Sequence, residues 1–265
     1  MFDRFGRTID YLRVSVTDRC NLRCEYCMPA EGVALVRRAD ILTFEEIAQV
    51  VTCAVGLGIR KVRLTGGEPL VRKGIATLVS MLAGIPGVQD LAMTTNATLL
   101  AAHAEALKRA GLQRLNISLD SLDPERYRAI TRGGTVADAL AGIAAAEAAG
   151  FTTIKLNCVV EQSREEPDAR GVAAFAAQHG LAIRFITRMK LDTGHFSTVD
   201  GGEGGNCRAC NRLRLTSDGR IFPCLFNDCC FSIRERGIEQ ALRAAIAHKP
   251  ERGERASHWI CALGG

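Results

Sequence analysis

Features that are absent from the 265-residue sequence exclude several classes of protein. It contains no run of 18 apolar residues, so we expect no transmembrane helix and no membrane partner. The first residues lack the charged-then-apolar pattern of a secretory signal. Neither sign of charge dominates, because 34 basic and 29 acidic residues leave a formal net charge of +5. These charges are scattered, so we expect no nucleic-acid surface, although a small anionic ligand would still bind favourably in a basic pocket.

No tandem repeat or low-complexity stretch interrupts residues 11–188, which alternate strand-like and helix-like patterns. Apolar residues make up 47% of the chain, which is enough for a sizeable core. Alternating strands and helices predict an α/β fold with a parallel sheet. Six βα units, where a closed barrel has eight, favour a partial (βα)6 TIM-like barrel with its site at the carboxyl ends of the strands. The predicted strands are 12–16, 61–64, 89–94, 114–118, 153–160 and 182–186, and the predicted helices are 43–56, 73–83, 99–110, 136–149 and 167–179.

Three cysteines follow the first predicted strand with the spacing C-x3-C-x2-C: Cys20, Cys24 and Cys27. Three thiolates on one loop can hold three irons of a [4Fe–4S] cluster and leave the fourth iron without a protein ligand. A zinc knuckle or a disulfide pair is the alternative. It is disfavoured because zinc prefers four ligands and no fourth Cys or His lies nearby. We identify this spacing as the signature of radical S-adenosylmethionine (SAM) enzymes.

A second set of three cysteines, Cys207, Cys210 and Cys224, lies near the C-terminus. The spacing alone fits three of the four ligands of a zinc ribbon about as well as it fits three ligands of a [4Fe–4S] cluster. Beside the first set, a second [4Fe–4S] cluster becomes the favoured interpretation. Arg212 and Arg214 lie on one face of the predicted strand between Cys210 and Cys224, where they suit an anionic ligand. A solvated strand face is the alternative.

Five further cysteines lie outside these sets. Cys53 and Cys158 fall within a predicted helix and a predicted strand, so we expect them to be small buried hydrophobes. Cys229, Cys230 and Cys261 have no role that the residues alone indicate. Free thiols beside open clusters require a reducing compartment, and we expect a cytoplasmic protein.

Basic side chains also occur inside predicted strands, where a bare cation is costly without an anionic partner. They are Arg13, Arg63, Lys155 and Arg184. One alone is usually explained by a salt bridge, but four suggest a basic barrel lumen and a polyanionic substrate. Gly66 and Gly67, after the second strand, allow close backbone approach to a ligand, and Glu68 can accept hydrogen bonds from an ammonium group. An ordinary turn is the alternative for these three residues.

Together these motifs resemble the GTP 3′,8-cyclase (MoaA) family of radical SAM enzymes. The resemblance covers most of the chain and includes the terminal Gly264-Gly265. The residues that carry it are 13–29, 63–70, 94–96, 116–120, 155–157, 184–186 and 207–225.

The resemblance implies two [4Fe–4S] clusters and SAM as cofactors, and GTP as substrate. Reduction of the first cluster would cleave SAM to a 5′-deoxyadenosyl radical, which takes hydrogen from ribose C3′ so that C3′ attacks C8. The product would be (8S)-3′,8-cyclo-7,8-dihydroguanosine 5′-triphosphate, an early intermediate of molybdenum cofactor biosynthesis. A flavodoxin- or ferredoxin-like electron donor and, by pathway, cyclic pyranopterin monophosphate synthase would be partners of a monomer or homodimer.

The resemblance also implies residue roles. Cluster ligands would be Cys20, Cys24 and Cys27 for the first cluster and Cys207, Cys210 and Cys224 for the second. SAM would be bound by Tyr26, Gly67, Glu68, Ser118 and Met189. GTP would be surrounded by Arg13, Arg63, Thr94, Lys155, Arg184, Arg212 and Arg214. Arg13, Gly264 and Gly265 would act in catalysis, with the tail reaching into the site.

The sequence departs from the family pattern at three places. Ala97 replaces a usual Gly, Thr187 stands where an acidic residue is common, and only residues 190–206 separate Met189 from the second cysteine set. We therefore predict a radical SAM barrel at 1–189, a shortened Gly-rich linker at 190–206 and a C-terminal Fe–S segment at 207–265. Two alternatives stay open: a radical SAM enzyme acting on a peptide or another nucleotide, and a non-catalytic Fe–S or zinc redox protein.

Overall fold

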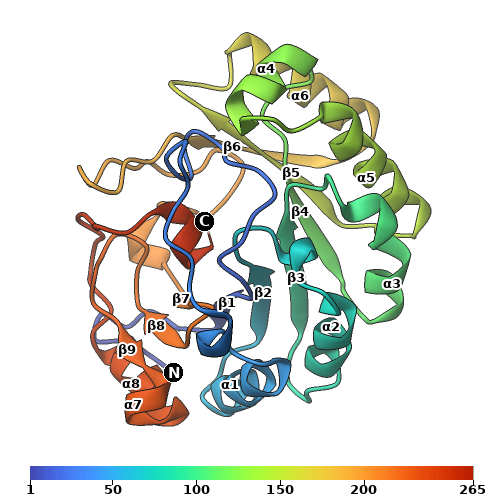
Figure 1. Ribbon diagram of the computed structural model, residues 1–265. Helices are drawn as coiled ribbons and strands as arrows, with labels where there is room; N and C mark the ends of the chain where they lie inside the picture. The colour runs from blue at the N-terminus through green and yellow to red at the C-terminus, as the bar shows by residue number, and fades with distance from the viewer. Residues whose placement is uncertain (265) are drawn as a thin grey trace.

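The computed structural model describes residues 1–264, within which nine strands form one curved sheet (Figure 1). The strand order is β6-β5-β4-β3-β2-β1-β7-β8-β9, and every pairing from β6 to β7 is parallel. The six predicted strands and the open, partial barrel are confirmed. A seventh parallel strand, β7, was not predicted as part of the barrel. The strands are β1 (Tyr11–Ser15), β2 (Lys61–Thr65), β3 (Asp90–Thr95), β4 (Arg114–Ser118), β5 (Ile154–Val160), β6 (Ala182–Thr187), β7 (Arg212–Leu215), β8 (Arg220–Phe222) and β9 (Phe231–Ser232).

Helices cover the outer face of this sheet and leave its inner face open to the centre of the molecule (Figure 1). The first begins with the predicted capping box, in which the Thr43 hydroxyl accepts from the Glu46 amide and the Glu46 carboxylate accepts from the Thr43 amide. None of the helices within residues 1–264 is long and apolar enough to cross a membrane. The helices are α1 (Phe44–Gly56), α2 (Ile75–Ala83), α3 (Ala104–Arg109), α4 (Pro124–Thr131), α5 (Val136–Ala148), α6 (Pro167–Gln178), α7 (Ile233–Arg236) and α8 (Ile238–Ala247).

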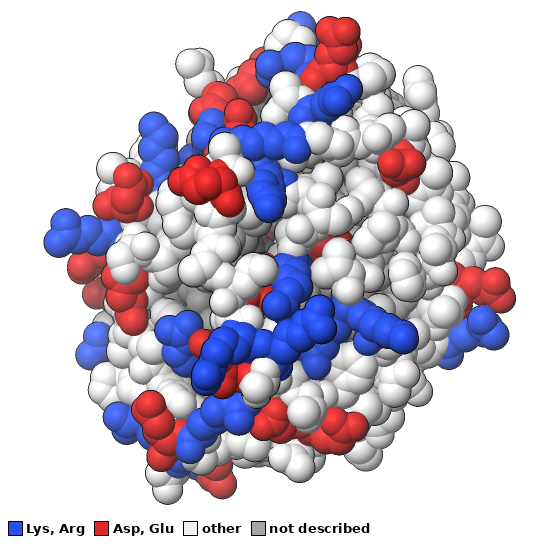
Figure 2. Space-filling view, viewed as in Figure 1, with Lys and Arg blue, Asp and Glu red and all other residues white. Residues whose placement is uncertain are grey.

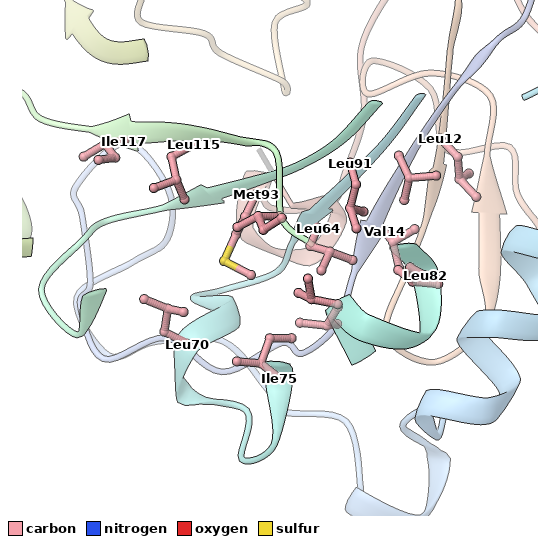
Figure 3. Packing of buried hydrophobic residues seen from close by; sticks show 14 of the residues in the cluster. Leu12, Val14, Leu64, Leu70, Ile75, Leu82, Leu91, Met93, Leu115 and Ile117 are labelled. Carbon is pink, nitrogen blue, oxygen red and sulfur yellow. The ribbon is translucent and has the colours of Figure 1, made fainter. Parts of the chain in front are cut away.

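The main core lies between the outer face of the sheet and these helices (Figure 3). Leu12, Val14 and Leu64 are fully buried there against Leu82 and its neighbours. Burial of each such side chain contributes roughly 1.5–3 kcal/mol. Because side chains alternate along a strand, the residues between them point to the inner face. The sheet therefore has an apolar outer face and an inner face that is free to carry functional side chains.

The C-terminal segment belongs to the same body as the barrel. Leu213 on β7 and Leu242 on α8 are members of the main core, and α8 packs against α1. A second apolar cluster joins Phe222, Leu225 and Phe226 to Ile260 and Leu263 near the C-terminus. The sheet and the core are therefore continuous across the boundary predicted at residue 206.

Residues 190–206, predicted as a flexible linker, lie along the edge strand β6. An antiparallel bridge pairs Phe185 with Asp200 through two backbone hydrogen bonds of 3.0 and 3.1 Å. A second bridge pairs Lys190 with His195. The segment therefore covers part of the edge strand at which the barrel stays open.

Candidate active site

The inner face of the sheet carries two cavities that meet. The first lies at the carboxyl ends of the strands and is lined by both predicted cluster and predicted SAM residues. The second extends from there toward β7 and the second cysteine set. Thr94, Asn157, Ile186 and Met189 line both. A small molecule in one cavity can therefore contact a molecule in the other.

The first cysteine set lies on the loop after β1. Cys20, Cys24 and Cys27 all line the first cavity, and a turn closed by the Cys27 amide and the Cys24 carbonyl (2.9 Å) shapes the loop. Burial raises the pKa of Cys20 to about 11 and that of Cys24 to about 12, and it also raises the pKa of Cys27 well above its ordinary value. Thiolates in this environment need a cationic partner, which bound iron supplies.

All eleven cysteines lie among the described residues and are free thiols. Zinc draws its ligands around one ion, whereas a [4Fe–4S] cluster binds each thiolate on a different iron. Three cysteines of one loop can therefore hold a cluster without converging on a single centre.

Tyr26 ties the cysteine loop to the far side of the first cavity. Its hydroxyl donates to Asp120 Oδ2 at 2.6 Å, and Asp120 Oδ1 accepts from the Val159 amide at 2.8 Å. Burial raises the pKa of Asp120 to about 6. Sequence reasoning did not select Asp120 as a site residue, although its position directly after β4 was an available signal. Ser118, at the end of the same strand, lines this cavity too, and its role in binding SAM stays a prediction.

Gly66 and Gly67 bring the loop after β2 against the loop after β1. The Gly67 amide donates to the Thr17 carbonyl and the Glu68 amide to the Arg19 carbonyl, both at 2.8 Å. A Cβ on Gly67 would overlap the Arg19 carbonyl and lie 2.9 Å from the Cys20 amide. The close approach that the glycines allow is therefore to the cysteine loop, and both residues also line the first cavity.

Glu68 lies at the wall of the first cavity, but both its oxygens already accept hydrogen bonds from the protein. Oε1 accepts from the Leu70 amide (3.1 Å) and the Thr95 hydroxyl (2.7 Å), and Oε2 accepts from the Asn96 amide (2.7 Å). Burial raises the pKa of Glu68 to about 7. In this structure Glu68 links the ends of β2 and β3.

The second cavity is lined by cations, and Lys and Arg side chains gather around the central hollow in Figure 2. All the predicted substrate residues line it: Arg13, Arg63, Thr94, Lys155, Arg184, Arg212 and Arg214. Lys61 and Arg114, which sequence reasoning missed, line it too, and they pair with Asp10 and Asp90 respectively. The structure thus brings the predicted cations into one cavity.

Strand register explains how these cations meet. Arg13 on β1 lies opposite Arg63 on β2 and opposite Arg214 on β7, so three guanidinium groups form a row across the sheet. Burial and mutual repulsion lower the pKa of Arg63, and they lower that of Arg214 to about 10. Among residues 1–264, the buried Nε atoms of Arg63 and Arg184 find no hydrogen-bond partner. Such a row favours binding of a polyanion.

The C-terminal tail lies in the hollow of the barrel (Figure 1). The Gly264 carbonyl accepts hydrogen bonds from Arg13 Nη2 and Arg214 Nη1, each at 3.0 Å. Gly264 also lines the first cavity beside the cysteine loop. Gly265 lies outside the described residues. Two of the predicted substrate arginines therefore also anchor the tail.

The second cysteine set borders the other end of the second cavity. Cys207 and Cys210 precede β7, and Cys224 follows the antiparallel β8, so all three meet at the amino end of β7. The two sets thus lie at opposite ends of the paired strands β1 and β7.

Comparisons with known proteins identify the class of this fold and site. The model of the Radical SAM superfamily matches residues 14–168, so the chain is a radical SAM protein. A crystal structure of Streptococcus suis SuiB bound to S-adenosylmethionine gives a TM-score of 0.63 at 16% identity, over 93% of this chain and 65% of that one. The enzyme anSMEcpe with bound AdoMet gives 0.64 at 13% identity, over 96% and 88%. These likenesses concern the fold.

Relatives that are similar in sequence identify the family within this class. A protein of Moorella thermoacetica is 40% identical over 323 aligned positions that cover all of both chains. A second, from Alkaliphilus oremlandii, is 40% identical and covers 95% of this chain and 94% of its own. A third, from Geobacter sulfurreducens, is 39% identical over 95% and 93%. Each is named GTP 3′,8-cyclase, and the chain belongs to that family.

The alignment with the Moorella thermoacetica relative also shows that this chain is short for its family. Its 323 positions exceed the 265 residues of the chain by 58, so at least 58 positions have no residue here. The shortened segment expected at residues 190–206 stays a prediction.

Proposed function

We propose that this protein is a GTP 3′,8-cyclase that uses SAM and two [4Fe–4S] clusters. The observation that carries the proposal is the pair of joined cavities, with three thiols at one end and a row of buried arginines leading to three more thiols at the other. Its product would be (8S)-3′,8-cyclo-7,8-dihydroguanosine 5′-triphosphate, formed early in molybdenum cofactor biosynthesis.

In the first cavity, Cys20, Cys24 and Cys27 would hold the first cluster, and Tyr26, Gly67, Ser118 and Met189 would surround SAM. When bound there, the cluster and SAM supply the 5′-deoxyadenosyl radical, which is chemistry that the protein itself does not provide. The chain's own contribution is placement. Asp120 holds Tyr26, and Glu68 holds the ends of β2 and β3, so the walls of this cavity keep their shape.

In the second cavity, the buried guanidinium groups would hold GTP. Arg63, Arg184 and Lys155 would neutralise the triphosphate, because Arg and phosphate form paired hydrogen bonds and the mutual repulsion of the cations is relieved. Arg212 and Arg214 lie beside the second cysteine set and would place the guanine there. Arg13 and the tail would lie at the ribose, where the two cavities meet.

The reaction needs one electron from outside for each SAM cleaved. A flavodoxin- or ferredoxin-like protein of the cytoplasm would supply it, and the enzyme would act as a monomer or homodimer. The product would pass to cyclic pyranopterin monophosphate synthase.

Anaerobic incubation with SAM, GTP and dithionite tests the activity. We expect 5′-deoxyadenosine to form as GTP disappears, with deuterium from 3′-deuterated GTP appearing in the 5′-deoxyadenosine. The Cys24→Ala variant, which loses one first-cluster ligand, should form neither product. If 5′-deoxyadenosine formed equally with and without GTP and took up no deuterium, GTP would not be the substrate.

A further inference from the structure

Lys249 is a buried cation that the proposed function leaves unused. It follows α8 and is 1% exposed, although a buried ammonium group is costly unless its donors are all used. Its Nζ donates to the carbonyls of Arg212 and Pro223, each at 2.7 Å. An ammonium group has three donors. Two of these donors are used by the two backbone carbonyls.

These contacts link the chain segments that carry two of the second-set cysteines. Arg212 stands two residues after Cys210, and Pro223 immediately precedes Cys224. One ammonium group therefore joins the start of β7 to the end of β8. If it were removed, both segments would lose a common partner, and the Pro223 carbonyl would lose a buried hydrogen bond.

Arg7 completes the arrangement from the other side. Its Nη1 donates to the Cys207 carbonyl at 2.7 Å, and its Nε pairs with Asp3 at 2.6 Å. Arg7 also donates to the carbonyls of Pro250 (2.7 Å) and Glu251 (3.0 Å), which directly follow Lys249. The segments of all three second-set cysteines are thus held by Lys249 or Arg7.

We propose that Lys249 is a positioning residue of the second [4Fe–4S] cluster, where it holds the carbonyls of Arg212 and Pro223 beside Cys210 and Cys224 and its fixed charge raises the reduction potential of the cluster. The inference rests on the proposed function in that it requires this cluster. On reduction the cluster gains one electron, supplied in the test by dithionite, and no covalent bond forms or breaks. A fixed cation beside the thiolates stabilises the more negative, reduced state.

The test uses the full-length chain with Cys20, Cys24 and Cys27 replaced by Ala, so that only the second cluster can form. Lys249→Met removes the charge at similar length, and Lys249→Arg keeps it. Lys73→Met, at an exposed position just before α2, is the matched control. Iron and sulfide content and an electron paramagnetic resonance redox titration are measured after anaerobic reconstitution.

We expect Lys249→Met to disfavour reduction at least tenfold, which is a downward shift of about 59 mV for one electron. Lys249→Arg should keep a potential near that of the parent, and Lys73→Met should match the parent. If Lys249→Met instead loses the cluster while Lys249→Arg retains it, the positioning role is supported.

Two outcomes overturn the inference. One is a Lys249→Met chain with about four irons and an unchanged potential. The other is equal loss of the cluster in Lys249→Met and Lys249→Arg, since side-chain packing and not charge would then matter. If the parent chain itself takes up no cluster, the proposed second cluster is wrong and Lys249 has no such role. This outcome differs from the two above because it concerns the parent chain and not the Lys249 variants.

Discussion

Replacing Gly67 by Ala should remove the first cluster without unfolding the protein. The added Cβ would overlap the Arg19 carbonyl and lie 2.9 Å from the Cys20 amide. These atoms are backbone, so no side-chain rotation can relieve the overlap. The loop before Cys20 must move, and it then loses the two 2.8 Å hydrogen bonds that the Gly67 and Glu68 amides donate.

The expected cost follows from these contacts. Two backbone hydrogen bonds contribute about 1 kcal/mol each, and overpacking adds about 1–3 kcal/mol, so stability should fall by about 3–5 kcal/mol. The displaced loop carries Cys20 at its end, so the iron content should fall from about eight to about four per chain. Urea denaturation of the metal-free protein and anaerobic iron analysis measure the two effects.

Gly171→Ala provides the matched control within the same chain. Gly171 lies inside α6, and a Cβ there would meet no atom within 4 Å. The substitution should stabilise the protein by about 0.5–1 kcal/mol, because Gly is less favourable than Ala in a helix interior, and should leave both clusters in place. A Gly67→Ala protein with about eight irons and unchanged stability would refute the close approach of the two loops.

Three further outcomes follow from the site. Arg63→Ala should weaken GTP binding at least tenfold by calorimetry, because it removes a buried guanidinium from the second cavity, whereas Arg236→Ala on exposed α7 should not. Cys210→Ala should halve the iron content while SAM still binds, and loss of both clusters would contradict separate sites. Between pH 4.5 and about 7 the folded protein keeps the Glu68 proton that the unfolded chain releases, so the melting temperature of the metal-free protein should fall as pH rises. Glu68→Gln should reduce this fall of the melting temperature with pH. Asp120 contributes to the fall in the same direction, so some of it should remain. If the substitution left the pH dependence unchanged, Glu68 would not be buried as described.

Local patterns were sufficient to predict much of the barrel. Strand alternation and the Thr43 capping box placed the elements near their observed bounds, because each depends on neighbours in sequence. The missed helix α4 also had a local signal, since the Asp123 carboxylate caps it and Pro124 begins it. The pairing of β7 with β1 had none, because it joins residues about 200 positions apart. For that reason the C-terminal segment was predicted as an extension and not as part of the sheet.

The features of the site also fall into those that the sequence predicts and those that depend on tertiary contacts. Cysteine spacing and cations at inward strand positions are visible in sequence, and the structure brings them together. Whether a polar side chain is already occupied depends on tertiary contacts, so Glu68 was predicted to be available although its two oxygens accept three hydrogen bonds from the protein. Asp120 and Lys249 were missed for the same reason. Their partners, Tyr26 for Asp120 and the carbonyls of Arg212 and Pro223 for Lys249, come from distant parts of the chain.

The pairing of β1 with β7 has a consequence for the size of the molecule that the enzyme can process. The first cysteine loop follows the carboxyl end of β1, and the second cysteine set stands at the amino end of β7 beside it. The five-residue strand β1 between them spans about 16 Å at roughly 3.3 Å per residue. A nucleoside together with the adenosyl group of SAM can bridge that gap, whereas a smaller substrate would contact only one site. Hydrogen bonds between two neighbouring strands therefore set the distance over which the two metal sites must cooperate.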